Sequence, residues 1–206
     1  MNHNLTVLQL LLAALRAAHW SHWTSHWQVK GNSFYGDHEL MDRLYNSLIE
    51  EIDTLAEKIV CDFGYEAVHP APQAQTMAQL LIPVEKNSGG DPLQRALFVE
   101  ESLQVFFKAA YNYHKKKDYL SLGMDDFLMS MANAHEENLY LMRQRMNVPR
   151  KKMAFNKYNP TELVAQLMKV LNNSGLVTTT DYLKRHRVPQ VVNEAWMNRH
   201  MVEDFH

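Results

Sequence analysis

The apolar positions of the first 147 residues recur with the period of an α-helix. In the first segment they are spaced by 4, 3, 4, 3 and 4 residues, so they form one stripe of an amphipathic helix over residues 4–30. This stripe consists of Leu8, Leu12, Leu15, His19, His22 and His26. A second helix is predicted over residues 37–64, with Leu40, Leu44, Leu48, Ile52, Leu55 and Ile59 on its core side.

Turn signals separate these helices from two more. Gly31-Asn32 ends the first helix. Residues 65–92 contain four prolines and a Ser-Gly-Gly, which predicts a long connection with a short helix at 74–82. Asp91-Pro92 opens a third helix over 92–118, and a fourth follows Gly123 and ends at about Asn147. The predicted fold is all-α, a four-helix bundle whose long middle connection crosses over its length, which is the ferritin-like pattern.

The bundle is assigned to residues 1–148, and residues 149–206 form a separate extension. Asn159-Pro160-Thr161-Glu162 predicts the start of a further helix, and short helices are expected over 179–203. The extension is basic: residues 147–206 hold nine Lys and Arg against five acids, a net +4, whereas residues 1–146 carry 12 − 18 = −6. An acidic body with a basic tail is not typical of a domain that binds nucleic acid over its whole surface.

Cysteine content and targeting signals bear on the compartment. The single cysteine, Cys61, excludes a disulfide framework and a thiolate zinc site, and it favours a reducing compartment. The apolar run after Met1 lacks a basic leading segment and is interrupted by Arg16, so it is interpreted as a mature helix and not as a signal peptide. No uncharged apolar stretch of about 18 residues is present. We therefore expect a cytoplasmic protein with no membrane partner.

Two polar pairs on the second helix carry the candidate chemistry. His38/Asp42 and Asp53/Glu57 each have a spacing of four, which places both side chains of a pair on one face, one turn apart. All four groups fall within roughly 100° of arc, but the midpoints of the pairs are 15 residues apart, which is about 22 Å along the axis. One metal ion therefore cannot be bound by both pairs of the same chain.

A second copy of this helix, antiparallel across a two-fold axis, would bring each pair opposite the other pair of its partner and create two identical sites. His26 could join the His38/Asp42 half across the turn at residues 30–35. Two imidazoles and three carboxylates suit iron(II), while the absence of thiolates disfavours structural zinc. Each pair taken alone is more typical of a solvated helix face, so the residues by themselves leave both interpretations open.

Residues 26–59 resemble the signature of the mini-ferritins known as DNA-binding proteins from starved cells, the Dps family. The signature is H-W-x-x-K/R-G-x-x-F, then H-x-x-x-D, then D-x-x-x-E, and all ligand spacings (12, 4, 11 and 4) are retained here. The matching residues are His26, Trp27, Lys30, Gly31, Phe34, His38, Asp42, Asp53 and Glu57. A weaker resemblance covers residues 3–147.

The resemblance implies an iron-storage protein, a hollow homododecamer that oxidises Fe(II), usually with hydrogen peroxide, and stores the ferric mineral. Such an enzyme is a ferroxidase and protects against oxidative stress. By position, His26, His38 and Asp42 would come from one subunit, and Asp53 and Glu57 from its two-fold partner. Trp27 resembles a tryptophan thought to quench stray radicals; packing at the interface is an equally good role.

Two departures from the family bear on its second activity, DNA binding. Only Met1-Asn2-His3 precede the first helix, so the lysine-rich N-terminal tail is missing. The extension is longer than usual, and its basic clusters at 149–152 and 183–187 would act either as a phosphate-binding surface or as solvated helix ends. The alternative function is therefore a DNA-binding or structural cage protein that uses the extension as an interaction module.

The remaining polar positions have weaker assignments. His22 and His26 are also four residues apart, so they would form an accessory metal site. The more typical role of His22 is that of a buried, hydrogen-bonded histidine. Asp125 and Asp126 lie where related cages have acidic pores on a three-fold axis. An equally good interpretation is that they are acids at a helix N-terminus, which the helix dipole favours. Ala132 stands three residues before His135, so the Glu-x-x-His motif is absent and no di-iron site of the bacterioferritin type is expected. Trp20, Trp23 and Trp27 share an adjacent face, on which they are expected to pack.

Overall fold

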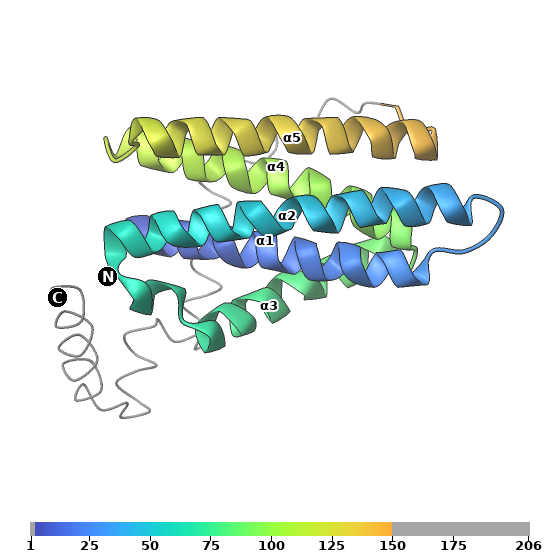
Figure 1. The fold of residues 1–206 in the computed structure, drawn as a ribbon, viewed down its shortest axis with the longest axis horizontal. Coiled ribbons are helices and arrows are strands. Elements are labelled where there is room, and N and C mark those ends of the chain that lie inside the picture. The colour runs from blue at the N-terminus through green and yellow to red at the C-terminus, as the bar shows by residue number, and fades with distance from the viewer. Residues whose placement is uncertain (1–2, 150–206) are drawn as a thin grey trace, which may run out of the picture. The chain divides into compact units, whose positions relative to one another are not determined.

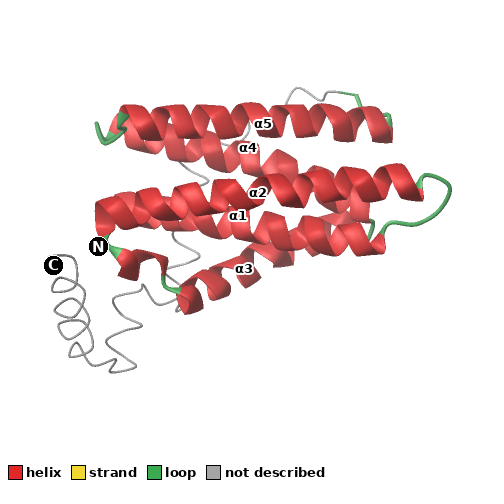
Figure 2. Cartoon of the chain, in the orientation of Figure 1, coloured by secondary structure: helices red, strands yellow, loops and turns green. Residues whose placement is uncertain are grey.

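The structure is a computed structural model that describes residues 3–149. Five α-helices and one short 3₁₀-helix account for nearly all of this part, and it contains no β-strand (Figure 2). The elements are α1 (His3–Gln28), α2 (Phe34–Phe63), η1 (Tyr65–Val68), α3 (Pro70–Ser88), α4 (Pro92–Lys116) and α5 (Leu122–Met146). The predicted all-α helical bundle is confirmed. None of the described helices is long and apolar enough to cross a membrane.

Local capping chemistry sets the helix ends. The carboxylate of Asp91 accepts a hydrogen bond from the backbone N–H of Gln94, with Pro92 at the first helical position, so α4 starts where the sequence predicts. The hydroxyl of Ser121 accepts from the N–H of Met124 and starts α5 just before Gly123. Asn147 ends α5 in the left-handed conformation, with φ of 53°.

The connection between α2 and α4 is mostly helical, which corrects the prediction of a loop with a short helix at 74–82. Helix α3 is 19 residues long. It can begin at Pro70 because no intrahelical N–H bond is needed in the first turn. It continues through Pro83 and ends at Gly89, whose φ of 59° is left-handed. As Figure 1 shows, α3 carries the chain back along the bundle before α4 begins, so the connection crosses over as expected.

The core lies between α1, α2, α4 and α5, with α1 contacting both α2 and α4. Its largest fully buried side chains include Leu12, Leu15, Leu48, Leu55 and Phe107. Within the stripe predicted on α1, Leu8, Leu12, Leu15 and His22 are buried, whereas His19 and His26 are only half-buried. The helical period therefore located the core face of α1, and His26 lies near the margin of that face.

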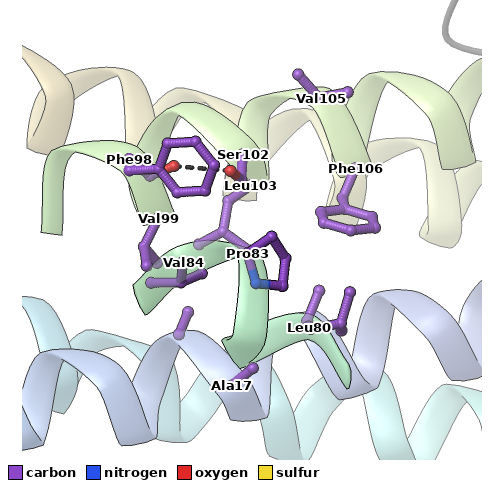
Figure 3. A pocket seen from close by; sticks show the side chains of 12 residues that line it. Ala17, Leu80, Pro83, Val84, Phe98, Val99, Ser102, Leu103, Val105 and Phe106 are labelled. Atoms are coloured by element: carbon purple, nitrogen blue, oxygen red, sulfur yellow. Dashed lines mark hydrogen bonds between the residues drawn. The ribbon is translucent and has the colours of Figure 1, made fainter. Parts of the chain in front are cut away.

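An apolar pocket of about 210 Å³ lies between α1, α3 and α4. Figure 3 shows Val84 and Pro83 of α3 facing Val99 and Leu103 of α4, with Ala17 of α1 below them. Its only polar lining side chain is Ser102, whose hydroxyl already donates to the backbone carbonyl of Phe98. The pocket therefore reflects incomplete packing of α3 and offers no reactive group.

Candidate functional site

The imidazoles of His26 and His38 lie against each other across the turn between α1 and α2. Their ring centroids are 3.6 Å apart with an interplanar angle of 28°. The Nδ1 of each ring donates to the backbone carbonyl oxygen of the other residue, at 3.1 Å in both cases. In the neutral form of each ring, this reciprocal bonding places the proton on Nδ1 and leaves the Nε2 lone pair to a metal ion.

Asp42 lies one turn after His38 and is held by two neighbours on the same helix. Its Oδ1 accepts from the hydroxyl of Tyr45 at 2.6 Å, and its Oδ2 accepts from the side-chain amide of Asn46 at 3.1 Å. The hydrogen bond to Asp42 raises the pKa of Tyr45, and burial adds to the rise. The Tyr45 ring also meets the His26 ring edge-on, with centroids 5.4 Å apart. Tyr45 thus connects Asp42 to the stacked pair of His26 and His38, and these three residues are called the half-site below.

Asp53 and Glu57 lie further along the same continuous helix, and both are exposed. Within the described residues, neither carboxylate makes a hydrogen bond or an ion pair with another side chain. Because α2 is unbroken from Phe34 to Phe63, the separation of about 22 Å from the His38/Asp42 pair holds along its axis. A single chain therefore brings two of the five predicted ligands, His26 and His38, into contact. It links Asp42 to them through Tyr45 and leaves Asp53 and Glu57 apart.

Several large apolar side chains are exposed on the same two helices as these residues. Trp20, Trp23 and Trp27 are 55%, 37% and 62% exposed. Trp23 packs as expected, because its ring also contacts those of His19 and Tyr45, whereas Trp20 is mostly exposed. Trp23 and Trp27 contact each other with ring centroids 5.0 Å apart. Ile49, which is 54% exposed, lies on α2 between the two polar pairs. An exposed apolar face of this kind is typical of a surface that a second protein covers.

A second group of ionisable side chains lies inside the bundle, and the sequence did not single out its carboxylates. The Nε2 of His22 contacts Oε1 of Glu100 at 2.9 Å. His135 bridges two carboxylates, with Nδ1 at 2.6 Å from Glu100 and Nε2 at 2.9 Å from Glu51. The expected role of His22 as a buried, hydrogen-bonded histidine is confirmed, because its side chain is fully buried and bonded to Glu100.

The sequence signal that could have identified Glu51 and Glu100 is their position in the helical repeat. Glu51 falls three residues after Leu48 and four before Leu55, which is a core position of α2, and Glu100 is likewise in phase with Leu97 and Leu103. A carboxylate at a core position is seldom fully buried without a charged partner. His135 is the partner that both glutamates share.

This core network shifts two pKa values strongly. Burial alone would raise the pKa of Glu100, but the charge of His135 and hydrogen bonds from His135 and His22 lower it to about 2. Burial alone would lower the pKa of His135, but the charge of Glu100 and hydrogen bonds to Glu100 and Glu51 raise it to about 10. At neutral pH, His135 is therefore a cation held between two carboxylates.

The other predicted positions are placed as follows. In residues 3–149 no group of three or more His, Cys, Asp or Glu side chains is assembled as a metal-ion site. Asp125 lies in the first turn of α5, where the helix dipole favours an acid, and Asp126 follows it. The predicted helices of the extension and nearly all of its basic clusters lie outside the described residues.

Comparison with known proteins gives one distant relationship. No family model matches the chain, and no solved structure matches it. The chain is similar to an uncharacterized low temperature-induced protein of Nostoc sp. and to its homologue in Anabaena variabilis, at 26% identity over 122 residues in both cases. The match covers 57% of this chain and 65% of each relative, so the chain spans less than two thirds of the length of the relatives it matches.

Proposed function

We propose that this protein is an iron-storage and detoxification protein, a ferroxidase that oxidises Fe(II) with hydrogen peroxide at sites shared between two copies of the chain. The observation that carries the proposal is the division of donors along α2. One half-site holds two imidazoles with Asp42 one turn after His38, and the other offers two exposed carboxylates about 22 Å away that have no side-chain partner within residues 3–149. Neither half supplies enough ligands alone, whereas the two halves complement each other across a two-fold axis.

The residues have distinct roles in this site. The Nε2 atoms of His26 and His38 and the carboxylate of Asp42 bind Fe(II), the substrate, from one side. Asp53 and Glu57 of the second copy close the site and balance the positive charge. Each peroxide molecule accepts one electron from each of two Fe(II) ions and is reduced to two water molecules by taking up two protons. Peroxide and free Fe(II) are consumed together, which prevents formation of hydroxyl radicals.

The apolar surface supports the same pairing. The midpoints of the two polar pairs lie at positions 40 and 55 of α2, so the two-fold axis would pass near position 47.5, which is close to Ile49. Ile49 would then lie against the partner helix at the centre of the interface. Trp27 would be covered next to the half-site of His26. As in the family that residues 26–59 resemble, we propose that such dimers assemble into a hollow dodecamer that holds the ferric product.

Anaerobic mixing tests the proposed reaction. Fe(II) is added to the metal-free, full-length protein without oxygen, and hydrogen peroxide is then added. The expected result is rapid ferric absorbance with about two Fe(II) oxidised per peroxide, and a particle mass well above that of one chain. A control with His38→Ala/Asp42→Ala should oxidise iron no faster than buffer. Equal rates in the wild type and this variant would overturn the proposal.

A further inference from the structure

The buried network of Glu51, Glu100, His22 and His135 has one member on each of four helices, α2, α4, α1 and α5. Its three contacts, from 2.6 to 2.9 Å, run in the order His22, Glu100, His135, Glu51. Glu100, His22 and His135 are 0% exposed and Glu51 is 6% exposed. The network is thus a core feature, separate from the residues at the surface of α1 and α2.

Stability alone does not call for such a network. Exchanging a buried ion pair for well-packed apolar residues is often neutral or stabilising. The surrounding core already consists of side chains such as Leu48, Leu103 and Phe107, and the Phe107 ring lies 5.3 Å from that of His135. Facing helices of a bundle place side chains in its interior, where they can bind a ligand.

The network contains the types of donor atom that bind transition metals, although residues 3–149 assemble no group of three such side chains around a metal position as they stand. Glu100 uses both of its oxygens, Oε1 toward His22 and Oε2 toward His135, so one carboxylate connects two imidazoles. The Nδ1 of His22 is buried and has no hydrogen-bond partner in the part of the chain that the structure describes. The His22 ring can therefore shift or change tautomer without breaking a second hydrogen bond. Two imidazoles and one carboxylate suit a divalent ion such as Fe(II), Co(II) or Zn(II).

We propose that Glu100, His22 and His135 bind one divalent transition-metal ion inside each chain, and that Glu51 holds His135 in position from behind. His135 would coordinate through Nδ1 while its Nε2–H donates to Glu51, an arrangement common around metal-bound histidines. The three contacts of the network are at hydrogen-bond distance in the structure. Donors on one metal ion with bonds of about 2.1 Å lie about 3 Å apart, which is close to the distances that join Glu100 to His22 and to His135. Binding of the ion would displace the protons of these two contacts. This site holds one ion and needs no partner chain.

Cobalt(II) is a suitable probe because its visible absorption reports nitrogen and oxygen ligation. The full-length, metal-free protein is titrated in a background that carries alanine at His38, Asp42, Asp53 and Glu57, so that the proposed interface site cannot contribute. We expect saturable binding of one Co(II) per chain, counted by native mass spectrometry. Because that background has no interface site, the result is independent of the proposed ferroxidase function.

Four further substitutions in the same background assign the ligands. Glu100→Gln and His22→Ala should abolish the saturable binding, and Glu51→Gln should weaken it about 10–100-fold. Glu101→Gln is the matched control, because Glu101 is the next residue of α4 but pairs with Arg143 and not with the network. The Glu101→Gln variant should bind Co(II) like the parent. If circular dichroism shows that Glu100→Gln is unfolded, His22→Ala decides, because it leaves Glu100 paired with His135. Absence of saturable binding in the parent, or equal binding after His22→Ala, would overturn the proposal.

Discussion

His26 and His38 each donate a hydrogen bond from Nδ1 to the backbone carbonyl of the other, and their rings stack 3.6 Å apart. The two hydrogen bonds connect the end of α1 to the start of α2. In both rings, the hydrogen-bonded nitrogen is Nδ1. The half-site is therefore preorganised by the turn that joins the two helices, before any second chain binds. In the proposed site, Asp53 and Glu57 of a second chain supply the remaining ligands.

Subunit mixing tests whether the site is shared. His38→Ala/Asp42→Ala removes one wall from every site, and Asp53→Ala/Glu57→Ala removes the other, so each variant alone should lose most ferroxidase activity. After dissociation and mixing at equal ratio, half of the dimers are mixed, and one of the two sites in each mixed dimer keeps all four α2 ligands. Activity should return to about a quarter of that of the wild type. If exchange is verified by mass and activity stays at the level of the single variants, the shared site is wrong.

Replacement of Ile49 tests the proposed two-fold axis without removing a ligand. Ile49→Lys would place two like charges together at the centre of the interface, which costs several kcal/mol. We expect dissociation by analytical ultracentrifugation and a loss of ferroxidase activity of at least about tenfold. Met129→Lys is the control, because Met129 is similarly exposed, at 61%, but lies on α5. A fully assembled, active Ile49→Lys variant would exclude this face.

The core network predicts how stability depends on pH. The pKa of His135 is about 10 when folded against 6.5 unfolded, so its stabilisation is complete below pH 6.5 and is lost as the pH rises through 10. The pKa of Glu100 is about 2 against 4.5, so its stabilisation is present above pH 4.5 and is lost as the pH falls through 2. The urea midpoint of the wild type should therefore fall between about pH 6 and about pH 10.

His135→Gln should flatten this alkaline decline, since glutamine has no proton to lose. His19→Gln is the control: burial and the neighbouring His22 lower the pKa of His19, so its replacement should leave the decline unchanged. Parallel alkaline declines in the wild type and in His135→Gln would show that another group is responsible.

The pocket in Figure 3 predicts a stabilising substitution. Ala17 lines this pocket of about 210 Å³, so Ala17→Leu should add apolar contacts there and raise the free energy of unfolding by about 1 kcal/mol. Ala13 lies one turn earlier on α1, is 0% exposed and does not line the pocket. Ala13→Leu should therefore overpack the core and lower the free energy of unfolding by about 1–3 kcal/mol. Thermal and urea unfolding of the two variants measure this contrast.

The helices themselves were predictable because the signals that define them are local. The apolar spacing of α1 and α2, the Asp91-Pro92 start of α4 and the end of α5 at Asn147 all depend on neighbours within a few residues. The same locality explains the error at α3. Prolines and glycines between residues 65 and 92 indicated a connection without long helices, yet Pro70 and Gly89 lie at the ends of α3, where they are tolerated.

The sequence also determined the spacing of the candidate ligands, since a continuous helix fixes the distance from Asp42 to Asp53. Only the tertiary structure decided that His26 stacks on His38, and that Glu51, Glu100, His22 and His135 meet in the core. The four core residues come from four helices, and Glu51 and His135, which are in direct contact, are 84 positions apart in the sequence. Helical phase places a residue on the inner face of its own helix, but its partner depends on how the helices pack against one another. That packing involves contacts between distant residues, which a local pattern does not encode.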